Sequence, residues 1–283
     1  MIFVTGPARS GTSLVAQTLI RHLPVSYFNN LTAVFQRAPI AANILFRKMI
    51  CQKKVNYKSY YGKTVSFSGP NDGLHIWDRW TGKDRTSIPG SLGEKERNDM
   101  LIFFGAYEKA FRKPFVNKNN NLSTFASLIA DALENAHFIY IKRDPLYLAQ
   151  SLLKARIEIQ GDVHVPYGIH SPTWTNKNVG DLDFVQDVCE QVLFHEEITK
   201  KQQRKVGYQR FWVESYEEFC DSPERLVVRV AAKILGQPIE VEALRKELKP
   251  FNCANTLKID KNLFQRIQDI FDKIRKENNL LNS

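Results

Sequence analysis

The fold is decided by a stretch near the N-terminus, Gly6-Pro7-Ala8-Arg9-Ser10-Gly11-Thr12-Ser13-Leu14. It follows a short apolar run, residues 2–5, and opens a segment with helical spacing of apolar residues, 12–22. A glycine-containing loop between a buried strand and a helix gathers free backbone N–H groups at the positive end of the helix dipole. The stretch therefore predicts an anion-binding loop at the carboxyl end of a first strand.

The two glycines have the spacing of a P-loop, Gly-x-x-x-x-Gly, but the residue that follows is different. A nucleoside-triphosphate P-loop continues with Lys, whose amine reaches the outer phosphates. Thr12 occupies that position here, and the cation of the loop is Arg9, which precedes the second glycine. This departure disfavours an ATPase or kinase. A nucleotide kinase, or another nucleotide-binding protein without that lysine, is the main alternative.

Strands alternate with helices along the chain. We expect further strands at residues 25–28, 114–116, 137–141 and 211–213. We expect helices at residues 31–51 (interrupted near Pro39), 94–111, 122–133, 146–156, 182–205, 221–236 and 261–276, with little regular structure in 52–92 and 157–180. Such alternation is typical of an α/β protein with a central parallel sheet flanked by helices, and its ligands lie at the carboxyl ends of the strands. One domain, residues 1–283, is expected.

Composition narrows the class of protein. The chain has 283 residues, 43% hydrophobic and 25% charged, which excludes a disordered or fibrous protein. A net charge of +10 favours an anionic partner: a nucleotide, nucleic acid, a membrane surface or an acidic substrate. The four cysteines have neither disulfide-scaffold nor zinc spacing, so we expect reduced, buried thiols. No signal peptide or 18-residue apolar run is evident, so we expect a cytoplasmic protein without a membrane anchor.

The segment Arg9-Ser10-Gly11-Thr12-Ser13-Leu14 resembles the 5′-phosphosulfate loop of sulfotransferases, which use 3′-phosphoadenosine 5′-phosphosulfate (PAPS) as sulfuryl donor. A second motif agrees with this resemblance. Residues 137–145 run from a strand into Arg143-Asp144-Pro145, and Ser151 follows Arg143 by eight residues. This pattern is similar to the family's 3′-phosphate motif, and the planar fork of Arg suits a phosphate. The two motifs occur in the order and strand context of the family.

A third match extends the resemblance to about residue 236. The strand at 211–213 continues into Glu214-Ser215-Tyr216, similar to the family's strand whose Tyr lies near the adenine, so Tyr216 is a stacking candidate. The Arg-Lys-Gly segment of the cytosolic small-molecule branch is missing, and residues 255–258 do not match it. The chain is therefore closer to the bacterial, carbohydrate and protein-tyrosine branches. The resemblance implies a P-loop-like sulfotransferase fold and the co-substrate PAPS, with PAP as product.

Sulfuryl transfer needs cations for the leaving group and a base for the acceptor hydroxyl. Arg9 fits the first role by its place in the loop. Lys118, at the end of the expected strand 114–116, looks like the family's strand-end lysine. Asp72 is the first candidate for the base, by similarity to an acidic residue that precedes an aromatic pair. His75 is the second, because its ordinary pKa suits proton transfer near neutral pH. Asp78 is a third and weaker candidate.

The acceptor is the least determined part. Basic charge and the aromatic loop at 157–180, which holds Tyr167, Trp174, His164 and His170, favour a carbohydrate or a glycolipid, with that loop as a lid. A lipid or polyketide alcohol and a protein tyrosine stay open. No metal cluster is expected, because the transferred group carries less charge than a phosphoryl group. A nucleic-acid-binding module is a further alternative, but no motif supports it.

Overall fold

Five parallel strands form the centre of the protein in the computed structural model, which describes residues 1–46, 57, 59–84, 87–171 and 183–281. Their order is β2-β5-β1-β6-β7. The strands are β1 (Ile2–Thr5), β2 (Ser26–Tyr27), β5 (Phe115–Lys118), β6 (His137–Lys142) and β7 (Phe211–Ser215). The central strand β1 pairs with β5 on one side and β6 on the other. The α/β class, the single domain and the parallel sheet expected from the sequence are therefore confirmed.

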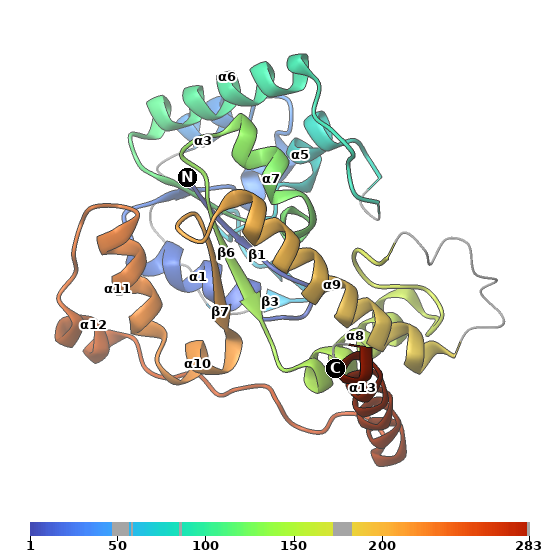
Figure 1. The fold of residues 1–283 in the computed structure, drawn as a ribbon. Coiled ribbons are helices and arrows are strands. Elements are labelled where there is room, and N and C mark those ends of the chain that lie inside the picture. Colours follow the sequence, from blue (N-terminus) through green and yellow to red (C-terminus); the bar gives the residue numbers. More distant parts are fainter. Residues whose placement is uncertain (47–56, 58, 85–86, 172–182, 282–283) are drawn as a thin grey trace.

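Helices cover both faces of the sheet (Figure 1). The first group comprises α1 (Thr12–His22), α10 (Tyr216–Asp221), α11 (Pro223–Lys233) and α12 (Val241–Glu247). The second comprises α5 (Leu74–Thr81), α6 (Glu94–Phe111) and α7 (Leu122–Ala132). Successive side chains of a strand point to opposite faces. Accordingly Phe3 of β1 packs in the aromatic core beneath α5, α6 and α7, whereas Ile2 and Val4 pack against α1 and α11.

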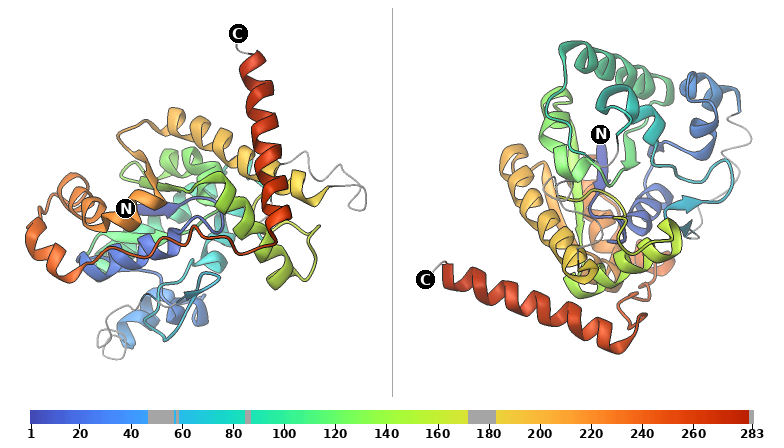
Figure 2. Two further views of the ribbon diagram at one scale, coloured as in Figure 1. Left: turned by 90° about the horizontal axis from the view of Figure 1, so that it is seen from below. Right: turned by 90° about the vertical axis from the view of Figure 1, so that its right-hand side faces the viewer.

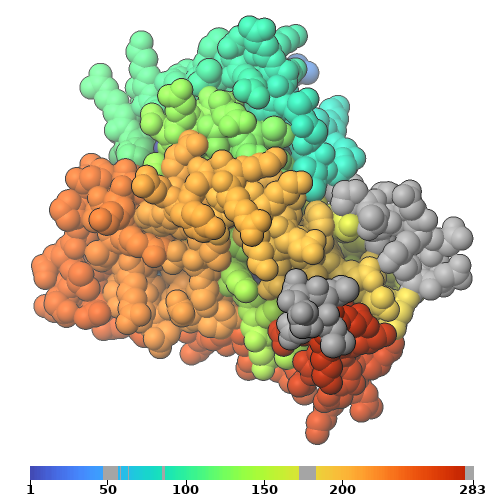
Figure 3. All heavy atoms as spheres, in the orientation of Figure 1, coloured from blue at the N-terminus to red at the C-terminus, as the bar shows by residue number. Residues whose placement is uncertain are grey.

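A third layer lies beside the carboxyl end of β6. It contains α8 (Pro145–Ala155), the π-helix η1 (Arg156–Gln160), α9 (Phe184–Val206) and α13 (Lys261–Leu281). Ile267 and Phe271 of α13 are buried against α8 and α9, although the helix projects from the body of the protein (Figures 2 and 3). The chain between α12 and α13 runs along the carboxyl edge of the sheet to reach this layer (Figure 2).

The remaining elements lie between residues 30 and 64, partly within the region 52–92 for which little regular structure is expected. They are α2 (Asn30–Val34), α3 (Pro39–Leu45) and a hairpin of β3 (Ser59–Tyr60) and β4 (Lys63–Thr64). The expectation of little regular structure in 52–92 is wrong for the hairpin and for α5. Ile76, Trp77 and Trp80 lie on one face of α5 and are buried in the aromatic core. Their burial stabilises this helix, which the aromatic-rich sequence of residues 74–81 did not predict. The C-terminal part of the expected helix 31–51 lies outside the described residues.

Candidate active site

The loop between β1 and α1 has the backbone conformation of an anion cradle. Gly11 has a φ of 97° and Arg9 one of 73°, both in the left-handed region. A Cβ on Gly11 would lie 2.3 Å from Cδ2 of Tyr216, so only glycine lets the loop pass this ring. The first N–H groups of α1 have no acceptor within the helix, as at any helix N-terminus. Ser10 adds a fully buried Oγ without a hydrogen-bond partner in the described part of the chain. The loop therefore fits an oxyanion.

Arg143 joins three segments at the carboxyl end of β6. Its Nε donates to Oδ1 of Asn255 (2.9 Å), and its two terminal nitrogens donate to the carbonyls of Arg9 (2.8 Å) and Ala254 (3.0 Å). Its guanidinium lies over the ring of Tyr216, 5.0 Å from the centroid. Burial lowers the pKa of Arg143 from its ordinary value, while Tyr216 and other neighbours oppose that change. These contacts hold the guanidinium in one place beside the loop, where it can bind a second anionic group.

Arg9 points toward α8. Its Nε donates to Oγ of Ser151 (3.1 Å), and its guanidinium stacks 4.3 Å from the ring centroid of Tyr61 at the tip of the β3–β4 hairpin. Burial and a hydrogen bond to Glu158 raise the pKa of Tyr61 to about 12, so this phenol is neutral near physiological pH. The sequence motif pairs Ser151 with Arg143, whereas in the structure Ser151 accepts a hydrogen bond from Arg9. Both arginines and Ser151 line the same cavity.

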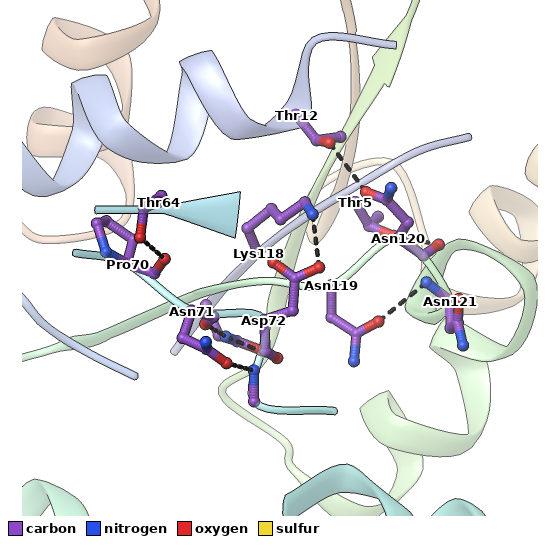
Figure 4. Close-up of polar contacts among 12 residues, drawn as sticks. Thr5, Thr12, Thr64, Pro70, Asn71, Asp72, Lys118, Asn119, Asn120 and Asn121 are labelled. Atoms are coloured by element: carbon purple, nitrogen blue, oxygen red, sulfur yellow. Dashed lines mark hydrogen bonds and ion pairs between the residues drawn. The ribbon is translucent and has the colours of Figure 1, made fainter. Parts of the chain in front are cut away.

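Asp72 and Lys118 form an ion pair in which Nζ lies 2.6 Å from Oδ2 (Figure 4). Lys118 ends β5 and is 8% exposed. The Asp72 backbone is held by Asn117, whose side-chain amide donates to the carbonyls of Asn71 (3.2 Å) and Asp72 (3.3 Å). Asn117 is itself fixed by the indole N–H of Trp77, 2.9 Å from its Oδ1. The aromatic core beneath the sheet thus positions the carboxylate against the lysine.

His75 is not brought to this pair. Gly73 has a φ of 68° and begins α5, so the chain changes direction between Asp72 and His75. The His75 ring lies on the first turn of α5 with 53% of its side chain exposed, 3.6 Å from Oδ2 of Asp78. Neither His75 nor Asp78 is among the residues that line the cavity around Lys118. His75 is therefore not brought into the cavity that Asp72 and Lys118 line, and its role as a base stays a prediction.

One cavity of about 480 Å³ connects the loop, Arg143 and the Asp72–Lys118 pair. This volume suits a small-molecule site. Its lining includes the predicted Arg9, Gly11, Thr12, Ser13, Lys118, Asp72, Arg143, Ser151 and Tyr216. Ser10 is buried behind the loop instead. The lining also includes residues that the sequence analysis missed: Tyr60, Tyr61, Asn120, Gln150, Lys154, Glu158, Ala254 and Lys258.

Glu217 organises the side of the cavity near Tyr216. Its Oε1 accepts from the backbone N–H of Asp144 (3.0 Å) and from the side chain of Asn255 (2.7 Å). Burial opposes the charge on Glu217, but these hydrogen bonds prevail and its pKa lies below the ordinary value. Burial raises the pKa of Tyr216 to about 12, and its hydroxyl accepts from the N–H of Ala254 (3.2 Å). A carboxylate therefore fixes Asn255, which in turn accepts from Arg143.

The loop expected as a lid is described only in part, because Trp174 lies outside the described residues. Tyr167 lines the cavity, and its ring meets that of Tyr61 edge-on with centroids 6.1 Å apart. His164 and His170 are not lining residues. Within the described ranges no group of three or more His, Cys, Asp or Glu side chains could hold a metal ion. Nor does any helix there combine the length and apolar character needed to cross a membrane.

A model of the sulfotransferase family matches residues 2–236. The chain belongs to the sulfotransferase family. Two solved structures have the same fold. The sulfotransferase STF9 from Mycobacterium avium is 13% identical, with a TM-score of 0.56 and an alignment covering 98% of this chain and 76% of that one. The sulfotransferase STF1 from Mycobacterium tuberculosis H37Rv is 12% identical, with a TM-score of 0.53 and coverage of 95% and 75%. No curated protein matches the sequence.

Membership of this family confirms the resemblance carried by the two anion-binding motifs, and the enzyme is a sulfotransferase. The matched region ends at residue 236, yet Ala254 and Asn255 contact Arg143. The cavity of this sulfotransferase therefore uses side chains from beyond the segment that identifies the family.

Proposed function

We propose that this sulfotransferase binds PAPS in the cavity of about 480 Å³ and transfers its sulfuryl group to an acceptor hydroxyl of a carbohydrate or glycolipid. The observation that carries the proposal is the alignment of two anion sites and one acid–base pair along a single cavity. The loop of residues 9–13 receives the 5′-phosphosulfate through its free backbone N–H groups and Arg9. Arg143 and Ser151 receive the 3′-phosphate, and Tyr216 contacts the adenine.

The transfer follows from the positions of three side chains. Asp72 takes the proton from the acceptor hydroxyl while that oxygen forms a bond to sulfur. The bond between sulfur and the bridging oxygen breaks, and Arg9 and Lys118 stabilise the charge that develops on the leaving phosphate, so PAP is released. Lys118 already contacts Asp72 at 2.6 Å. When the donor occupies the loop, its anionic phosphate and sulfuryl oxygens compete for this ammonium and leave the carboxylate available as a base.

The rest of the chain is assigned by its contacts. We place residues 237–283 in the same domain, 1–283, because Leu244 and Leu248 pack beneath α1 and α11 while Ile267 and Phe271 pack on α8 and α9. Cys189, Cys220 and Cys253 are free thiols, which fits a reducing cytoplasm, although Cys253 is exposed rather than buried as expected.

A thermal-shift comparison tests the donor. PAP should raise the Tm of the protein, whereas ATP with Mg²⁺ should raise it less, because the lysine of nucleotide kinases is replaced by Thr12. Incubation with PAPS and a panel of hydroxyl compounds should then yield PAP and a product heavier by one sulfuryl group in mass spectrometry. A larger shift with ATP and Mg²⁺ would contradict the proposal and favour a nucleotide kinase.

A further inference from the structure

Gln17 is a buried polar residue that the site described so far does not use. It lies on α1 four residues after Ser13, so both side chains share one face of the helix. Gln17 is 1% exposed, yet among the described residues neither its Oε1 nor its Nε2 has a hydrogen-bond partner. A buried amide without partners costs free energy, since it loses its hydrogen bonds to water and gains none in return. A buried, unpaired amide of this kind is therefore a candidate for hydrogen bonding to a ligand.

The amide lines a small hollow next to the catalytic pair. Four residues line both this hollow and the main cavity: Ser13, Gly62, Asp72 and Lys118. Its volume of about 10 Å³ is that of one water molecule or one hydroxyl group. Figure 4 shows Asp72 and Lys118 pointing toward one another, near Thr64, Pro70 and Asn71, which also line the hollow.

Two neighbouring polar side chains in the hollow, Thr64 and Asn71, are already paired. Oγ1 of Thr64 donates to the carbonyl of Pro70 (2.8 Å), and the side chain of Asn71 bonds to the N–H of Gly73 (2.9 Å) and to Asn30 (2.9 Å) (Figure 4). They therefore do not pair with the side-chain amide of Gln17, whose nitrogen can donate and whose oxygen can accept a hydrogen bond. This amide lines the same hollow as Asp72, the proposed base.

We infer that Gln17 is an acceptor-binding residue that hydrogen-bonds a second hydroxyl, adjacent to the hydroxyl that is sulfated. The inference rests on the proposed function and narrows its acceptor to polyhydroxylated compounds such as sugars. A hydroxyl both donates and accepts, which matches an amide. The hollow admits a group of hydroxyl size, and Asp72 lines both the hollow and the main cavity, so that group lies near the oxygen that Asp72 deprotonates. A compound with one hydroxyl leaves the amide unpaired and gains nothing from it.

The test compares acceptors that differ in the second hydroxyl. Wild type and Gln17→Leu are assayed for PAP formation from PAPS, with methyl glycosides of glucose, galactose and mannose and with cyclohexylmethanol, a single-hydroxyl alcohol of similar size. We expect wild type to prefer at least one glycoside. Gln17→Leu should lower kcat/KM for that glycoside about 30- to 100-fold and change it less than twofold for cyclohexylmethanol. PAP affinity should not change.

A matched variant separates binding from folding. Gln202 is also a buried glutamine, but its amide oxygen accepts from Ser127 N–H (2.8 Å) and its nitrogen donates to the Thr124 carbonyl (2.9 Å). Gln202→Leu should lower Tm and leave the preference between acceptors intact. Gln17→Leu should instead raise Tm of the free enzyme, because an unpaired amide is removed.

Three results would overturn the inference. One is an unchanged acceptor preference in Gln17→Leu together with a lower Tm, which would mean that the amide binds a structural water only. Another is an equal loss for both acceptor types. The third is no transfer to any glycoside by a wild type that binds PAP and slowly hydrolyses PAPS, which would exclude these polyols and leave the donor assignment standing. A wild type that neither binds PAP nor hydrolyses PAPS would instead remove the proposed function on which the inference rests.

Discussion

Replacing Arg143 by Ala is expected to remove recognition of the 3′-phosphate and little else of the donor. Three of the five N–H groups of Arg143 are engaged, by Asn255 and by the carbonyls of Arg9 and Ala254. The two others are available for a phosphate. A hydrogen bond to a charged group contributes about 1.5–3 kcal/mol, so the loss of two corresponds to at least about 3 kcal/mol. At 1.36 kcal/mol for each tenfold, the Kd of PAP should rise by roughly 100-fold or more.

The assay is isothermal titration calorimetry with two ligands that differ only in the 3′-phosphate, PAP and adenosine 5′-phosphate. Both should lose some affinity in Arg143→Ala, because Asn255 and Ala254 lose their anchor. Only PAP should lose the further factor of about 100. Arg143→Lys keeps the charge without the planar fork and should fall between wild type and Ala for PAP.

An equal loss of affinity for the two nucleotides would refute the reasoning, because Arg143 would then act only by organising the loop. A Kd of PAP within threefold of wild type would show that the 3′-phosphate binds elsewhere. A circular dichroism melt of each variant checks that the fold is retained, so that a loss of affinity is not a loss of folded protein.

Three further predictions concern catalysis, the loop and stability. Asp72→Asn should lower kcat about 10²- to 10⁴-fold while His75→Ala stays within threefold of wild type, measured as PAP release. Gly11→Ala should abolish measurable PAP binding in calorimetry, because its Cβ would meet the Tyr216 ring at 2.3 Å. Burial lowers the pKa of His195 to about 4 in the fold. Stability is then complete above pH 6.5, the unfolded value, and falls by up to roughly 3 kcal/mol as pH drops toward 4, as urea titrations should show.

Further variants and contrary results test these three predictions. Gly105→Ala lies in α6 with nothing within 4 Å of the new Cβ, so it should leave PAP binding unchanged. His195→Gln should flatten the decline in stability between pH 6.5 and 4, and an equally steep decline would show that another group is responsible. Full activity in Asp72→Asn would exclude Asp72 as the base, and Asp78→Asn would then be measured next.

The sheet and its anion loop could be predicted because their signals are local. A buried strand, a glycine loop and a helix follow one another within residues 2–22, and Arg143-Asp144-Pro145 repeats the pattern at β6. In α8, Asp144 caps the helix through Leu146 N–H at 2.9 Å, and Pro145 occupies its first turn, as helix-start chemistry requires. These features depend on neighbours in sequence alone.

The parts of the site that were missed depend on neighbours in space. Asn255 reaches Arg143 across 112 residues, and no local pattern marks it. The sequence ranks Asp72 before His75 as the base but does not show that they lie apart, because the left-handed turn at Gly73 between them is a property of the folded backbone. Tyr61 reaches Arg9 only through the short β3–β4 hairpin, whose strands of two residues give too little alternation to detect.

The contacts of Arg143 also bear on the order in which parts of the protein fold during synthesis. Its guanidinium joins the carbonyl of residue 9 to that of residue 254, which the ribosome adds to the chain much later. The sheet can assemble once β7 has emerged, but the wall of the donor cavity is complete only when residues 254 and 255 arrive. The proposed donor cavity is therefore completed only after the strands of the sheet have been made.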